Sequence, residues 1–110
     1  MCQTKQLITK LSKLKTNSQI ISQLLQAGWL VRPVAPSGGC YGGYALCPKC
    51  LSIISWWVCP PPEYPNSEIT VQQGFLNSIL RQKAREDVEK TVFMLKRIND
   101  EIVRVPVNIP

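Results

Sequence analysis

The sequence predicts an α+β fold with two short N-terminal helices, a small β-hairpin stapled by zinc through four cysteines, and a long C-terminal helix. Apolar residues recur at steps of three and four near both ends of the chain, and a segment rich in glycine and cysteine leads into a run of β-forming residues. The 110 residues suffice for one modest core. We therefore expect a single domain over 1–110, divided into a helical part at 1–28, a zinc and β region at 29–59, a proline-rich connector at 60–66, and a long helix with a tail at 67–110.

The N-terminal part has the pattern of amphipathic helices. Leucines and isoleucines from Leu7 to Leu14, and again from Ile20 to Leu25, lie three or four positions apart. Between them, Thr16 and Gln19 have the spacing of a capping box. Gly28 follows as a helix stop. We predict two short helices, or one bent helix, between about Lys5 and Ala27.

Two strands are expected next. "GWLVRPVAP" is typical of a short strand, and its prolines restrict it to a sheet edge or end it. In "SIISWWVC", alternation places Ile53, Ser55, Trp57 and Cys59 on one side and the residues between them on the other. The apolar run from Leu51 to Val58 is far shorter than the roughly 20 residues that cross a bilayer, and no membrane partner is expected.

The C-terminal half is predicted to be mostly helical. "PPPEYP" at 60–65 favours an extended connector; it also contains the PPxY pattern that WW domains bind. Thr70 and Gln73 have capping-box spacing, and apolar steps continue to Ile102. Unbroken from 70 to 103, this helix would be about 50 Å long, so it either breaks or projects toward a partner, such as a second copy in a homodimer. The tail "VRVPVNIP" has the alternation of an edge strand, which would pair beside "GWLVRPV".

The cysteines carry the clearest chemistry. Cys47 and Cys50, in Cys-Pro-Lys-Cys, have the spacing at which two thiolates bind one ion from a tight turn, and this turn resembles the knuckle of zinc ribbons. A closed zinc site needs four ligands, and the chain contains no histidine, so Cys40 and Cys59 are the expected second pair. Zinc ribbons take their second pair from another CxxC turn, which this chain lacks. We therefore predict a non-standard Zn²⁺ hairpin.

Three other interpretations of the cysteines remain open. CPxC is also the active-site motif of thioredoxin-like oxidoreductases. These proteins have a cis-proline loop well downstream of the motif, and this chain has no proline between Pro65 and Pro106 to form it. The spacing does not reproduce the usual iron–sulfur patterns. The thiols can also be unligated, buried apolar groups. Cys2 is left over in each case.

The excess positive charge lies in the first part of the chain. Residues 1–62 contain six lysines and arginines and no carboxylate, whereas residues 63–110 contain seven charges of each sign. Such an acid-free segment attracts nucleic acid or an acidic protein surface, although lysines also serve solubility alone. Four thiolates with one zinc ion would reduce the +6 to about +4.

We therefore predict a small basic zinc-binding protein that binds nucleic acid, DNA or RNA. The expected interface combines cations for phosphates with aromatic rings for bases: Lys10, Lys13, Lys15, Arg32, Lys49, Tyr41 and Tyr44. The alternative is a protein-interaction module, such as an adaptor, a complex subunit or a viral or mobile-element inhibitor, that docks through its long helix. A third hypothesis is a thiol oxidoreductase that uses Cys47 and Cys50.

No enzymatic activity is expected, because histidine is absent and the carboxylates lie almost entirely in the predicted long helix. The N-terminus lacks a secretory signal pattern, which favours a reducing, cytoplasmic location. "MCQTKQLITKLSKLK" is basic and amphipathic like an organelle-targeting segment, but it uses lysine where such segments favour arginine.

Overall fold

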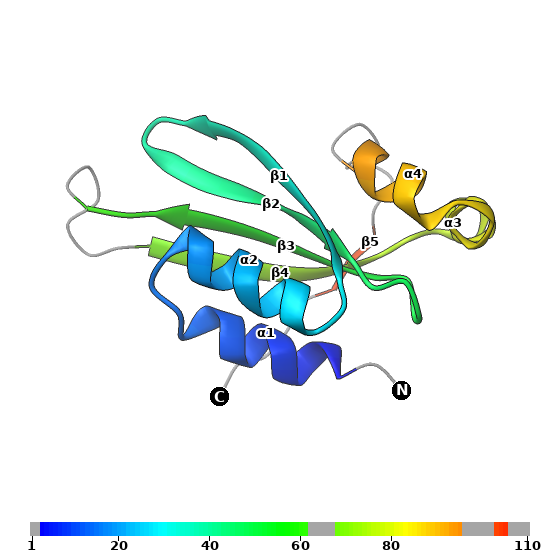
Figure 1. Cartoon of the computed structure of the whole chain (residues 1–110), viewed down its shortest axis with the longest axis horizontal. Coiled ribbons are helices and arrows are strands. Elements are labelled where there is room, and N and C mark those ends of the chain that lie inside the picture. The colour runs from blue at the N-terminus through cyan, green and yellow to red at the C-terminus, as the bar shows by residue number, and fades with distance from the viewer. Residues whose placement is uncertain (1–2, 62–67, 96–102, 106–110) are drawn as a thin grey trace.

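The protein is an α+β structure in which helices cover both faces of an antiparallel sheet (Figure 1). The computed structural model describes residues 3–61, 68–95 and, for the backbone alone, 103–105. The strands follow chain order across the sheet, β1-β2-β3-β4-β5. The elements are α1 (Thr4–Ser12), α2 (Asn17–Gln26), β1 (Leu30–Ser37), β2 (Cys40–Leu46), β3 (Ser52–Cys59), β4 (Glu68–Phe75), α3 (Ser78–Glu86), α4 (Val88–Met94) and β5 (Val103–Val105).

The two predicted N-terminal helices are confirmed. The Thr16 hydroxyl accepts a hydrogen bond from the Gln19 backbone N–H at 3.2 Å, and the Gln19 side chain accepts from the Thr16 N–H, which completes the capping box at the start of α2. Gly28 follows the end of α2 with φ of +84°, the left-handed conformation that glycine adopts at little cost. Local signals therefore place both ends of this helix.

The helices α1 and α2 cover one face of the sheet (Figure 1). Their buried side chains pack on the even-numbered residues of β3, as the alternation predicts. The buried Trp56 indole N–H also donates a 2.7 Å hydrogen bond to the Asn17 side-chain oxygen at the start of α2. This core consists of Ile8, Leu11, Ile20, Leu24, Trp29, Ala45, Cys47, Ile54, Trp56 and Val58.

A second core lies on the opposite face, at one end of the sheet only. There α3 and α4 pack over the end that holds Leu46 and Ile53 (Figure 1). The core consists of Leu46, Leu51, Ile53, Leu76, Leu80, Ala84, Val92 and Leu95. The remaining half of this face carries no described helix.

The predicted long C-terminal helix is wrong. Residues 68–75 form β4, which pairs with the whole of β3, and the helical part that follows is divided at Asp87. Asp87 has an extended φ of −153°, and its carboxylate caps α4 by accepting from the Lys90 N–H at 3.0 Å. The part of the predicted helix at 96–102 lies outside the described residues. Docking or dimerisation through one long helix therefore loses its basis.

The predicted small β-hairpin is also wrong in extent, because β2 and β3 form the centre of a larger sheet. β1 lies at the edge, as its prolines indicate. The strand expected in the tail pairs with β4 through Val103–Val105 rather than with β1. Residues 62–66 of the predicted connector lie outside the described part of the chain.

Candidate functional site

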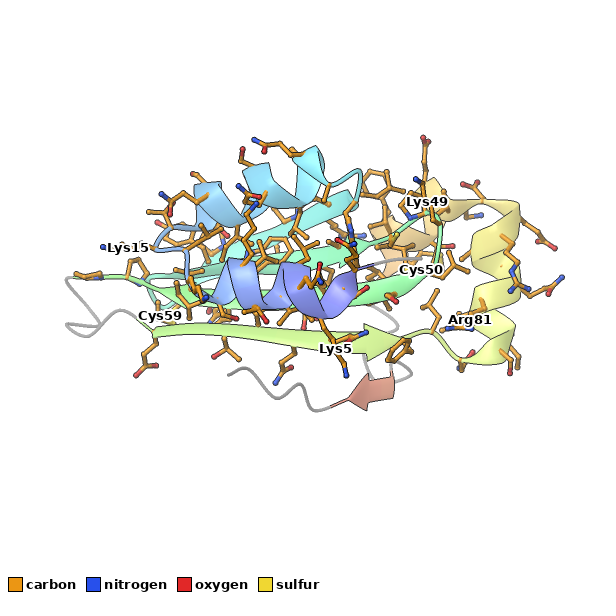
Figure 2. All side chains as sticks on the ribbon, turned by 90° about the horizontal axis from the view of Figure 1, so that it is seen from below. Lys5, Lys15, Lys49, Cys50, Cys59 and Arg81 are labelled. Carbon is orange, nitrogen blue, oxygen red and sulfur yellow. A yellow bond between two sulfur atoms is a disulfide. The ribbon has the colours of Figure 1, made fainter. Side chains whose placement is uncertain are left out.

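The hairpin of β2 and β3 separates the four cysteines into two pairs. Cys40 begins β2 and Cys59 ends β3, and the two form a disulfide. Cys47 and Cys50 lie in the turn at the other end. The strand β2 has seven residues, so the two ends are roughly 23 Å apart at about 3.3 Å per residue. Figure 2 shows this separation, with Cys59 and Cys50 near opposite ends of the sheet.

The structure therefore does not bring the predicted zinc ligands together. Among the described residues, no group of three or more histidine, cysteine, aspartate or glutamate side chains is placed to hold a metal ion. Cys50 is also disulfide-bonded, and its sulfur lies 3.4 Å from the Ser52 hydroxyl. Cys2 lies outside the described residues. Zinc binding stays a prediction, which metal analysis of the purified protein tests.

The disulfide also bears on the predicted location. Disulfides are uncommon in reducing compartments, so the Cys40–Cys59 bond weighs against the cytoplasm. The cytoplasmic location stays a prediction. No helix in the described ranges is both long enough and apolar enough to cross a membrane.

The Cys-Pro-Lys-Cys segment forms the turn between β2 and β3. The Leu51 N–H donates to the Cys47 carbonyl at 2.9 Å, and the Cys47 N–H donates to the Ser52 carbonyl at 3.0 Å. Leu51 has φ of +60° and still buries its side chain in the second core. Cys47 and Cys50 thus lie in the turn of a β-hairpin and not at the start of a helix, which differs from the thioredoxin-like arrangement.

A basic groove of about 670 Å³ lies between α1, the end of α2 and this turn. Lys10 of α1 and Lys49 of the turn both line it, beside the polar Gln3 and Gln6. An adjoining hollow of about 520 Å³ brings in Lys5, which the predicted interface did not include. Among the described residues, no carboxylate lines either hollow, and Glu68 of β4 lies at the Cys59 end of the sheet. Three lysines therefore line two adjoining hollows.

The other predicted interface residues do not join this groove. Lys13 and Lys15 follow α1, and Figure 2 shows Lys15 at the end opposite Lys49. Arg32 and Tyr44 are cross-strand partners on the face beneath α3 and α4, where the Arg32 guanidinium lies 5.7 Å from the centre of the Phe93 ring. Tyr41 is exposed at the far end of β2. The predicted set is thus divided among several surfaces.

A second concavity, of about 400 Å³, lies on the uncovered half of the face opposite α1 and α2. Trp57 lies over Gly42, its cross-strand partner, so closely that a Cβ at Gly42 would collide with the indole. On the other face, a Cβ at Gly43 would lie 2.8 Å from the Trp56 ring. Two glycines thus face two tryptophans across the hairpin. The alternation of β3 predicted this placement of Trp57, but not the cavity beside it.

Comparison with protein-family models, with curated proteins and with solved structures finds no match to this chain.

Proposed function

We propose that this protein binds nucleic acid, DNA or RNA, by holding phosphates in the basic groove of Lys10 and Lys49 and in the adjoining hollow beside Lys5. The observation that carries the proposal is the meeting of Lys10 and Lys49, from segments far apart in sequence, in one concavity whose described lining residues include no carboxylate. Backbone phosphates are the ligands that clustered lysines attract most generally.

The start of α1 adds to the positive potential of the groove. Its first turn contains no acidic residue, and Gln3 at the N-cap makes no side-chain capping hydrogen bond. The helix dipole therefore adds a partial positive charge beside the lysines, and no acidic residue of the first turn neutralises it. Lysines bind phosphate as point charges, so the proposed contacts carry no base specificity.

Salt-dependent binding tests the proposal. If three phosphates are neutralised, the logarithm of the affinity for duplex DNA should fall with that of the salt concentration at a slope of about −2.7, or roughly 40-fold between 50 and 200 mM salt. Fluorescence anisotropy with short labelled single-stranded and duplex DNA and RNA measures this slope. The double variant Lys10→Glu/Lys49→Glu should bind at least tenfold more weakly.

The matched control is Lys83→Glu/Lys90→Glu. Both lysines are exposed on α3 and α4, and the substitutions change net charge by the same amount as those in the groove. An equal loss of affinity in both double variants would show that binding depends on net charge alone and not on the groove. Undetectable binding of every oligonucleotide at low salt would eliminate the proposal.

A further inference from the structure

The uncovered half of the sheet face has the features of a second, separate binding site. The cavity of about 400 Å³ lies within the usual size range of small-ligand pockets. It belongs to the face that α3 and α4 cover only at the Leu46 end. The cavity and the basic groove thus lie on opposite faces of the sheet.

The floor of the cavity is held rigidly. Trp57 rests on Gly42 and is still 36% exposed, so one side of the indole is supported while part of it meets solvent. Cys59 lies two residues further along β3, on the same face, and its disulfide to Cys40 fixes the ends of both strands that carry this pair. A ligand therefore meets an aromatic surface that needs little ordering on binding.

The walls supply hydroxyl and amide groups but no charge. Tyr44, Ser55, Thr70 and Gln72 line the cavity together with Ser37 and small apolar side chains, and none of the lining residues is ionic. The nearest described carboxylate along β4, Glu68, is exposed on the same face two residues before Thr70. Arg32, the cross-strand partner of Tyr44, lies on the same face two residues before the lining residue Val34, so one charge of each sign flanks the cavity. A charged ligand group would therefore meet no ionic partner among the described lining residues.

From these features we infer that the cavity binds an uncharged sugar ring of a carbohydrate. One face of a sugar ring consists of C–H groups that pack on the apolar indole surface, and its hydroxyls match the donors and acceptors of the walls. A nucleobase also stacks on tryptophan, but it brings a phosphate backbone, and none of the described lining residues is a cation that could neutralise a phosphate. The inference goes beyond the proposed nucleic-acid binding and does not depend on it.

Saturation-transfer NMR tests this inference on the full chain. The probes are glucose, galactose, mannose and N-acetylglucosamine at millimolar concentrations, with short linear oligomers of glucose and of N-acetylglucosamine. We expect transfer to at least one sugar. We also expect a change in tryptophan fluorescence, because Trp57 is exposed whereas Trp29 and Trp56 are buried.

Variants locate the site. Tyr44→Phe and Thr70→Val each remove a lining hydroxyl with little change in shape, and each should weaken sugar binding about three- to tenfold. Trp57→Ala should weaken it further, but that variant also uncovers Gly42. Phe93→Ala removes an exposed aromatic ring outside the cavity and should leave binding unchanged.

Three results would overturn the inference: no transfer to any of these sugars, transfer that Tyr44→Phe and Thr70→Val leave unchanged, or protection of Trp57 by oligothymidylate instead of a sugar. The last result would assign the cavity to base stacking. Lys10→Glu/Lys49→Glu should retain sugar binding, so failure of the proposed nucleic-acid function and failure of this inference are distinguishable.

Discussion

The disulfide between Cys40 and Cys59 should contribute a large share of the stability of this fold. The two cysteines are 19 residues apart in the sequence. In the chain-entropy description, closing a loop of that length in the unfolded state is worth about 3 kcal/mol at 25 °C. The whole free energy of unfolding of a domain is only about 5–15 kcal/mol. Loss of this bond should therefore be visible in any equilibrium unfolding experiment.

Urea unfolding of Cys40→Ala, Cys59→Ala and the double variant, under oxidising conditions, measures the contribution. For a urea m-value of about 1–3 kcal/mol/M, a loss of about 3 kcal/mol lowers the midpoint by about 1–3 M. Each single variant should lose nearly as much as the double variant, because either substitution opens the same loop.

Cys47→Ala is the matched control, since it removes another buried sulfur and leaves the Cys40–Cys59 loop closed. It should cost clearly less than either loop-opening variant. The reasoning is refuted if opening the loop leaves the midpoint at the parent value, or if the two single losses add up in the double variant.

Three further substitutions test the packing of the sheet and helices, each by thermal or urea unfolding. Gly43→Ala should cost about 1–3 kcal/mol, because its Cβ would lie 2.6 Å from the Arg32 carbonyl oxygen; an unchanged midpoint would mean that the strands separate without cost. Asn77→Ala should cost about 1 kcal/mol, because the side chain accepts from the Leu80 N–H at 2.9 Å; equal stability would contradict its capping role. Asn17→Ala should cost about 1–3 kcal/mol by leaving the buried Trp56 N–H without its acceptor, and a smaller loss than in Asn77→Ala would argue against that bond.

The sequence predicts the N-terminal half of the fold well because its signals are local. The capping box at Thr16 and the stop at Gly28 are contained within a few residues of the helix that they delimit. The alternation in β3 likewise predicts which side chains face each core, since neighbouring side chains in a strand point to opposite faces.

The C-terminal half was mispredicted because its structure depends on distant partners. Thr70 and Gln73 have capping-box spacing, but they lie in β4, which completes the otherwise open edge of β3. The adjacent Ile69, Thr70 and Val71 are β-branched and favour a strand, a weak preference that pairing reinforces. The break at Asp87 was equally hard to predict, since its charge also fits an i,i+4 pair with Lys83.

The spacing of the four cysteines fits two different arrangements. Six residues separate Cys40 from Cys47, and eight separate Cys50 from Cys59. The two segments are therefore nearly equal in length, one on either side of the turn. In an antiparallel hairpin, two strands of nearly equal length bring Cys40 and Cys59 together at the end far from the turn. The spacing that suggested four ligands is therefore also the spacing of a hairpin closed by a disulfide.

The single-layer sheet makes the two proposed sites physically independent. Lys10 belongs to α1, which packs against one face, whereas Tyr44 and Thr70 line a cavity on the other. A helix layer lies about 10 Å from its sheet, and the groove and the cavity share no lining residue. Substitutions at sites this far apart usually have additive effects. The sheet itself connects the two faces, because adjacent residues of each strand point to opposite sides, as Trp56 and Trp57 do against Gly43 and Gly42.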